Sequence, residues 1–126
     1  MTSKSSIVDE AETFIRERAE VLTSPRGNEC LCCYVARMLD QFPCDGSHRH
    51  ALRFRDLTAP RATAILDRLS QVGGCCCDCE LFLNGYRPRT WSPDDEGWTV
   101  DSLAPCSGVR RGSVRPCANW VRLFWR

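Results

Sequence analysis

The sequence predicts an α+β fold of three helices and a small two-stranded sheet, stapled by zinc and followed by an irregular C-terminal extension. Three observations predict it. Apolar residues recur at helical spacing in three segments, they alternate in two short segments, and ten cysteines occur among 126 residues. A hydrophobic content of 43% is typical of a globular chain that can bury a modest core.

The three predicted helices cover residues 6–22, about 30–42 and about 58–72. In each segment the apolar side chains fall on one stripe while charged or polar residues cover the other side. Ser6 can cap the first helix, and Pro43 ends the second. Threonine and an early proline open the third, and a Gly-Gly pair closes it.

The two predicted strands are residues 48–55 and 77–83, where apolar and polar residues alternate. In the first, Leu52 and Phe54 point inward, while the opposite face carries basic side chains, Arg49, Arg53 and Arg55. In the second, one face carries Cys77, Cys79, Leu81 and Leu83.

Three regions are predicted along the chain. Residues 1–29 are an N-terminal amphipathic helix and loop, and residues 30–86 are a cysteine-rich zinc-binding domain. Residues 87–126 form a C-terminal extension rich in tryptophan and arginine, interrupted by prolines.

Charge and hydropathy predict a cytoplasmic protein with no membrane partner. The net charge of +1 gives no overall attraction to nucleic acid or membrane. The N-terminal residues contain no apolar run of signal-peptide length, and no segment is apolar enough to cross a bilayer. In a reducing cytosol thiols persist, which favours metal ligation over a framework of structural disulfides.

Two cysteine pairs predict a zinc site. Cys30 and Cys33 stand at the start of a predicted helix, where a spacing of three places both sulfurs on one side. Cys77 and Cys79, two residues apart on a predicted strand, also share one side. Together the pairs offer four thiolates to a tetrahedral zinc ion.

A second set of zinc ligands is also possible, because the path of the chain determines which cysteines lie near Cys77 and Cys79. The second helix is about 18 Å long, so Cys44 lies at the opposite end from Cys30. If the third helix connects parallel strands, Cys77 and Cys79 begin near Cys44 and His48 instead. Those four residues are the alternative ligands.

The other cysteines and both histidines have a simpler interpretation. Cysteine is among the most buried residue types, and small buried side chains are expected at Cys32, Cys75 and Cys76. His48 and His50 are expected to be packed histidines with hydrogen-bonded rings. Cys106 and Cys117, in the C-terminal extension, have no assigned role at this point.

No enzyme is predicted, and no small-molecule substrate. The sequence contains no phosphate-binding glycine loop and no Ser/His/Asp set. A thiol-disulfide oxidoreductase that uses Cys30 and Cys33 is the enzymatic alternative, but their pair follows a helix and a loop rather than a strand of a βαβ unit.

Two basic segments could bind a partner. The first is the arginine face of residues 49–55, which could meet an acidic protein or RNA. The second runs from Cys106 to Arg126, where five arginines alternate with Trp120, Phe124 and Trp125 and no acidic residue occurs. This composition is typical of a nucleic-acid or partner-binding tail. The alternatives are a plain RNA-binding module, or a tail whose aromatic side chains pack on the domain.

Three cysteine motifs occur between residues 30 and 86: Cys30-Leu-Cys-Cys33-Tyr34, Cys44-Asp-Gly, and Gly73-Gly-Cys-Cys-Cys77-Asp-Cys79-Glu. With these motifs, residues 30–86 resemble a small actinobacterial family of cysteine-rich domains of unknown function. The resemblance suggests the mycobacterial factor that recruits a ribosome-hibernation protein (protein Y) to the small ribosomal subunit when zinc is scarce. The resemblance therefore implies a non-enzymatic adaptor that zinc regulates, and it implies nothing for the C-terminal extension.

Overall fold

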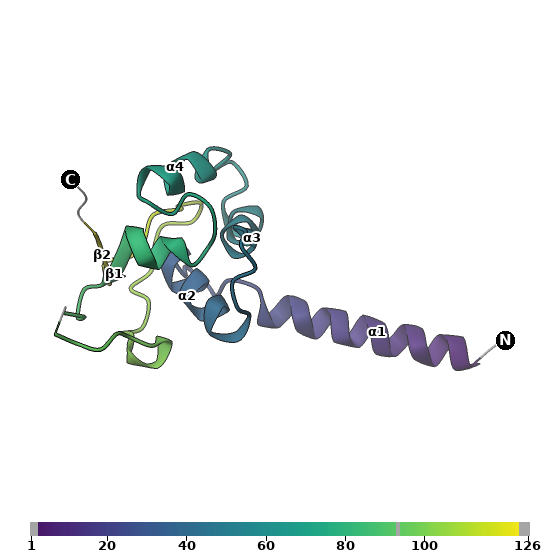
Figure 1. The fold of residues 1–126 in the computed structure, drawn as a ribbon. Coiled ribbons are helices and arrows are strands. Elements are labelled where there is room, and N and C mark those ends of the chain that lie inside the picture. The colour runs from purple at the N-terminus through teal and green to yellow at the C-terminus, as the bar shows by residue number, and fades with distance from the viewer. Residues whose placement is uncertain (1–2, 93, 124–126) are drawn as a thin grey trace.

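The computed structural model describes residues 3–92 and 94–123, and it confirms the α+β class. A body of short helices surrounds the core, a two-stranded sheet closes one side, and the first helix projects from the body (Figure 1). In chain order the elements are α1 Ser3–Leu22, α2 Leu31–Gln41, α3 Arg49–Thr58, α4 Ile65–Gln71, the π-helix η1 Leu81–Gly85, β1 Tyr86–Pro88, the 3₁₀-helix η2 Val100–Ser102 and β2 Trp120–Arg122.

Helix α2 is the centre of the core, as its amphipathic stripe predicts. Tyr34 and Phe54 of α3 are fully buried, and their ring centroids lie 5.7 Å apart. The Tyr34 hydroxyl donates to the carbonyl of Thr23, so even this buried ring keeps its polar atom paired. The residues of α2 that are buried are Leu31, Cys32, Tyr34, Val35, Ala36 and Met38.

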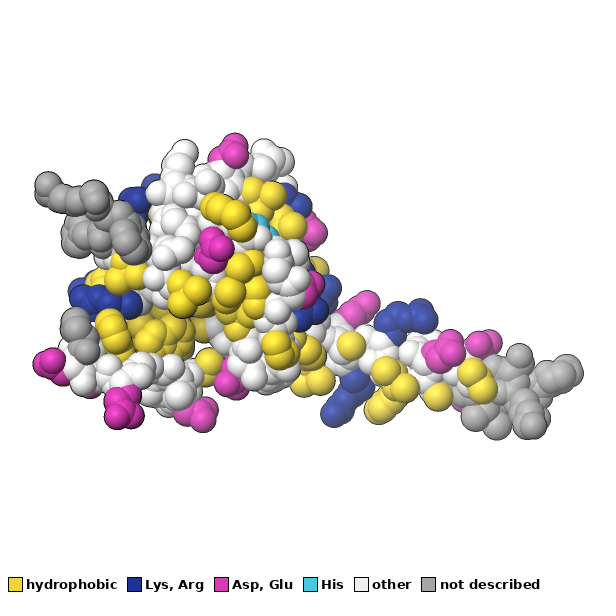
Figure 2. Space-filling model, viewed as in Figure 1, with side chains coloured by type: hydrophobic (Ala, Val, Ile, Leu, Met, Phe, Trp, Pro, Cys, Tyr) yellow, Lys and Arg dark blue, Asp and Glu magenta, His cyan; other side chains and the backbone are white. Residues whose placement is uncertain are grey.

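Helix α1 begins at Ser3, earlier than the predicted Ser6, and ends at the predicted Leu22. Figure 2 shows apolar and charged side chains side by side along this projecting helix. Large apolar side chains of this helix stay in contact with water, because each of the following is more than half exposed: Val8, Phe14, Ile15, Val21 and Leu22.

The predicted first strand, residues 48–55, is wrong, because these residues form α3. The buried side chains are His50, Ala51 and Phe54, which is helical spacing rather than alternation. The carboxylate of Asp78 accepts hydrogen bonds from the backbone N–H groups of His50 (2.8 Å) and Ala51 (3.2 Å). It thereby satisfies the first turn of α3, where the chain's own N-cap residue provides no side-chain bond.

The predicted second strand, residues 77–83, is also wrong. Asp78 is buried on the end of α3, so the chain turns there, and the π-helix η1 follows. Leu81 is 1% exposed and Leu83 is 67% exposed, so the two leucines do not share a face. The third predicted helix is real but shorter than residues 58–72, since Thr58 ends α3 and only Ile65–Gln71 form α4.

The sheet instead pairs residues around the start of the C-terminal extension, in β1, with residues near its end, in β2. Strand β1 pairs with β2 in antiparallel register, Tyr86 opposite Arg122 and Pro88 opposite Trp120. The rings of Phe82, Trp98 and Trp120 pack together with centroids 5.2 to 5.4 Å apart. Trp98 and Trp120 thus pack on the domain, while the predicted partner-binding residues Phe124, Trp125 and Arg126 lie outside the described residues.

Gly73, which follows α4, is expected to tolerate no side chain. Its φ is +96°, and a Cβ there would lie 2.8 Å from the Cβ of Asn84. Gly73→Ala is expected to lower the free energy of unfolding by about 2 kcal/mol or more, combining left-handed strain with a steric clash. Gly112→Ala is the control, because Gly112 has a φ of +85° and nothing within 4 Å. Denaturant unfolding of both variants checks this, and equal losses would contradict the steric part.

Candidate metal centre

Cys75 and Cys76 are bonded to each other, and the other eight cysteines carry free thiols. Seven of these eight gather in two clusters. The four-thiol cluster consists of Cys30, Cys33, Cys106 and Cys117. The three-thiol cluster consists of Cys44, Cys77 and Cys79. Within each cluster all sulfur atoms lie within 4.8 Å of one another, so either cluster could hold a metal ion.

The start of α2 supplies half of the four-thiol cluster. Cys30 is the N-cap residue, and its sulfur accepts a hydrogen bond from the backbone N–H of Cys33 (3.3 Å). The preceding loop is fixed by Glu29, which is 8% exposed and forms an ion pair of 2.8 Å with Arg37. Because the loop and the helix are both anchored, the first turn presents the two sulfurs on one side.

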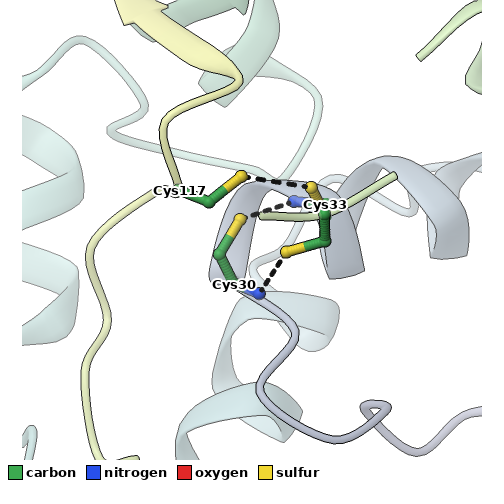
Figure 3. Close-up of side chains that lie close together, drawn as sticks. Cys30, Cys33 and Cys117 are labelled. Atoms are coloured by element: carbon green, nitrogen blue, oxygen red, sulfur yellow. Dashed lines mark hydrogen bonds between the residues drawn. The ribbon is translucent and has the colours of Figure 1, made fainter. Parts of the chain in front are cut away.

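The chain after η2, residues 103–123, supplies the other two cysteines of the cluster. We call these residues the C-terminal segment. It runs beside the loop that precedes α2, where Val109 N–H donates to the carbonyl of Asn28 (3.0 Å). The sulfur of Cys117 lies 3.8 Å from that of Cys33. Figure 3 shows Cys117 approaching the first turn of α2 from a separate segment, with its sulfur directed at that of Cys33. The cluster therefore brings together two parts of the chain that are far apart in sequence, the start of α2 and the C-terminal segment.

Backbone and indole N–H groups surround these sulfurs. Cys106 Sγ accepts from Cys30 N (3.3 Å) and from Gly108 N (3.4 Å), and Cys33 Sγ accepts from Trp120 Nε1 (3.3 Å). N–H donors aimed at sulfur stabilise thiolates and orient metal ligands.

The pKa values indicate that at least one of these thiols ionises readily. The hydrogen bond from the Cys33 thiol lowers the pKa of Cys30 to about 6, although burial acts in the opposite direction. The same bond, followed by burial, raises the pKa of Cys33. Burial also raises the pKa of Cys106. A divalent cation would supply the charge that the remaining thiols need in order to ionise.

The four-thiol cluster fits zinc by its donor chemistry. A zinc–sulfur bond is about 2.3 Å, so the sulfurs of a tetrahedral site are about 3.8 Å apart. The Cys33–Cys117 sulfur separation has that value, and all four sulfurs fall within the range that one ion can bridge.

Asp78 positions the three-thiol cluster. Its carboxylate holds the end of α3, and its backbone N–H donates to the carbonyl of Ser47 (3.0 Å). This clamp sets the Cys77-Asp-Cys79 turn against the loop that contains Cys44, and the Cys77 and Cys79 sulfurs are 3.2 Å apart. Burial raises the pKa of the Asp78 carboxyl, against the two N–H donors.

Within the three-thiol cluster, the pKa of the Cys44 thiol is lowered from its usual value. Desolvation opposes this, but the backbone N–H groups of Cys79 and Gly46 lower its pKa. The hydrogen bond with Cys77 raises the pKa of Cys79 to about 12.

The structure divides the residues predicted to share one site. Cys30 and Cys33 lie in the four-thiol cluster, whereas Cys77 and Cys79 lie in the three-thiol cluster with the alternative ligand Cys44. The other alternative ligand, His48, is not among the donors gathered there, and its Nε2 lies 2.7 Å from the carbonyl oxygen of Gly74.

Cys106 and Cys117 were not assigned from the sequence. The only local signal is Cys106-Ser-Gly108, in which a glycine with φ of +87° turns its N–H toward the sulfur. Cys32 is fully buried, as predicted. The same prediction is wrong for Cys75 and Cys76, which are exposed and bonded to each other as a vicinal disulfide.

The three predicted partner-binding arginines do not all share one face, because residues 49–55 are helical: Arg49 and Arg53, four residues apart, lie on one side of α3, and Arg55 lies on another. Arg49 donates to the carbonyl of Pro43 (2.7 Å), and Arg53 donates to that of Thr23 (3.0 Å). Arg55 pairs with Asp56 (2.9 Å). Each guanidinium therefore has a partner within the chain.

Replacing Trp120 tests whether N–H donors to the sulfurs contribute to metal binding. Trp120→Phe keeps a ring in the aromatic cluster but removes the donor to Cys33 Sγ, so a loss of about 1 kcal/mol in stability and weaker metal binding are expected. Trp98→Phe is the matched control, since Trp98 belongs to the same aromatic cluster and has no bond to a sulfur among those the structure describes. Competition with a chromogenic chelator measures the affinity, and equal affinities in the two variants would contradict a role for the donor.

Part of the chain matches a known family model. Residues 31–84 match a family described as a protein of unknown function, DUF2695. No curated protein and no solved structure matches the chain. The matched region includes the whole three-thiol cluster but only Cys33 of the four-thiol cluster. Within the described residues, no helix has the length and apolar character that spanning a membrane requires.

Proposed function

We propose that this protein is a zinc-binding, non-enzymatic adaptor. The observation that supports it is the four-thiol cluster, in which two sulfurs from α2 meet two from the C-terminal segment. Zinc is the cation proposed because it is redox-inert, tetrahedral and suited to thiolates. When bound, it would hold the C-terminal segment against α2 and so fix the surface that a partner meets.

The burial of Cys30 supports a structural rather than a redox role. A catalytic thiol must reach its substrate, whereas Cys30 is 0% exposed and its sulfur is the N-cap acceptor of α2. The alternative is a thiol-disulfide enzyme, and the experiment must distinguish it from the zinc-binding adaptor.

Metal analysis of reductively purified protein tests the proposal. We expect bound zinc in the wild type, and we expect no insulin-reducing turnover with or without chelator. Absence of bound metal would contradict the zinc assignment. Turnover that persists in chelator and is lost in Cys33→Ser would favour the oxidoreductase.

The partner proposed is a ribosome-hibernation factor, in a reducing cytoplasm, with recruitment to the small ribosomal subunit that depends on zinc. The resemblance of residues 30–86 supports this choice, and the metal-dependent position of the C-terminal segment offers a physical route for it. A pull-down with the full chain at high and low zinc tests it. Recovery of small-subunit proteins that is the same in both conditions would contradict zinc control.

An arginine-lined groove favours direct RNA contact as a second function. The loop before α2, the end of α3 and the C-terminal segment enclose a groove of about 950 Å³. Four exposed arginines line it, and its one acidic side chain, Glu29, is buried and paired with Arg37. The arginines are Arg26, Arg61, Arg110 and Arg111.

Replacing two of these arginines is expected to weaken RNA binding. Arg110→Glu with Arg111→Glu should lower the affinity for a single-stranded RNA and reduce the slope of its salt dependence by about two counterions. Arg16→Glu with Arg18→Glu, on the projecting α1, is the control of equal charge change. Fluorescence anisotropy over a salt series measures both. Similar losses in the two variants would indicate attraction by net charge alone.

A further inference from the structure

The three-thiol cluster has no fourth protein donor among the described residues. Both carboxylate oxygens of Asp78 are engaged by the N–H groups of α3. The Nε2 of His48 is engaged by Gly74, and the sulfurs of Cys75 and Cys76 lie with Glu80 in a separate group outside the three-thiol cluster. The nearby groups that could complete a tetrahedron are therefore committed elsewhere.

The surroundings of the cluster leave room for a ligand from outside. Cys44, Cys77 and Cys79 are each only partly buried, whereas two of the four cysteines in the other cluster, Cys30 and Cys117, are buried and two, Cys33 and Cys106, are partly buried. The loop that follows Cys44 is exposed through Asp45, Gly46 and Ser47. Solvent and small ligands can therefore approach the thiols from the side of this loop.

The charge of such a site would also favour a further ligand. Three thiolates and one Zn²⁺ carry a net charge of −1, while four thiolates carry −2. The metal at the three-thiol cluster would be the stronger Lewis acid, and it would retain affinity for a neutral donor such as imidazole.

We propose that Cys44, Cys77 and Cys79 bind a second zinc ion whose fourth position is open to an external monodentate donor. In the free protein water takes that position, and an imidazole or thiolate displaces it. This inference rests on the proposed function, since it requires that the chain bind zinc. It adds that the two clusters differ: the four-thiol cluster is closed, and the three-thiol cluster exchanges a ligand.

Cobalt substitution of the full chain tests the inference, because Co²⁺ absorption reports the donor set. The protein, reduced and loaded with Co²⁺, is titrated with imidazole while the visible bands are followed and the bound cobalt is measured. Two Co²⁺ per chain are expected, and only one set of bands should shift. Cys44→Ser should bind one fewer Co²⁺ and lose the shifting bands, while Cys32→Ser, outside both clusters, should keep them.

Each other outcome has a defined meaning. One closed site with no imidazole response overturns the inference but leaves the proposed function intact, whereas no bound Co²⁺ overturns both. Two bound Co²⁺ ions whose bands both stay unchanged with imidazole show that the second site is closed, and the inference is then wrong. If the response appears only in Cys75→Ser with Cys76→Ser, the reduced pair supplies the fourth ligand, and the inference is wrong.

Discussion

Replacing Cys117 by serine is expected to remove one bound metal ion per chain and most of the stability of the fold. Cys117 is 5% exposed, and its sulfur lies 3.8 Å from that of Cys33. Structural zinc contributes on the order of 10 kcal/mol to small domains, which equals the whole stability of many of them. Loss of this ligand should therefore release β2 and Trp120 from the core.

Metal content and denaturant unfolding, followed by tryptophan fluorescence with and without chelator, check this prediction. Cys32→Ser is the matched control, because Cys32 is a fully buried cysteine of α2 that lies outside both clusters. It should keep its metal, and chelator should destabilise it as it destabilises the wild type. Cys117→Ser with wild-type metal content and stability would show that the four-thiol cluster is not a metal site.

Replacing Asp78 by alanine is expected to have the second largest effect. Its side chain is 1% exposed and satisfies two backbone N–H groups of α3. Alanine leaves both donors unsatisfied in the core and removes the cap, at a cost of about 3 kcal/mol or more. The turn that positions Cys77 and Cys79 should also loosen, so metal binding at the three-thiol cluster should weaken.

Asp78→Asn and Asp45→Ala separate the causes. Asparagine keeps one acceptor oxygen, so its loss should fall between those of the wild type and of alanine. Asp45 is an exposed aspartate that accepts a hydrogen bond from the backbone of Ser47, and its replacement should cost less than either Asp78 variant. Unfolding curves and Co²⁺ stoichiometry measure the series. Asp78→Ala with wild-type stability would contradict the capping role.

Local periodicity was sufficient for α2 but not for α3. Helix α2 extends over eleven residues, and one stripe accounts for four of its buried side chains, Leu31, Tyr34, Val35 and Met38. Residues 48–55 are too few to distinguish alternation from a short helix. The group that decides between them, the carboxylate of Asp78, is 28 residues away in sequence from the N–H of His50 that it caps. Short-range patterns cannot contain that information.

The difference between local patterns and long-range contacts also explains which parts of the candidate metal centre could be predicted from the sequence. Sequence spacing identified the pairs Cys30/Cys33 and Cys77/Cys79, because each pair is positioned by a single turn of the chain. Which pair meets which other thiol depends on the path between them. Cys44 joins Cys77 and Cys79 because Asp78 fixes the turn to α3, and Cys117 reaches Cys33 because β2 pairs with β1. Neither contact has a local signature.

The four-thiol cluster also bears on how the chain folds. Cys106 is 76 residues from Cys30, and Cys117 is 84 residues from Cys33. In the chain-entropy account, a cross-link that closes a loop of this length removes about 4.5 kcal/mol of freedom from the unfolded state. Cys30 and Cys33 can hold a metal ion early at little entropic cost, because only two residues separate them. Capture of the distant cysteines is therefore the slow, non-local step, and the folding rate should depend on metal.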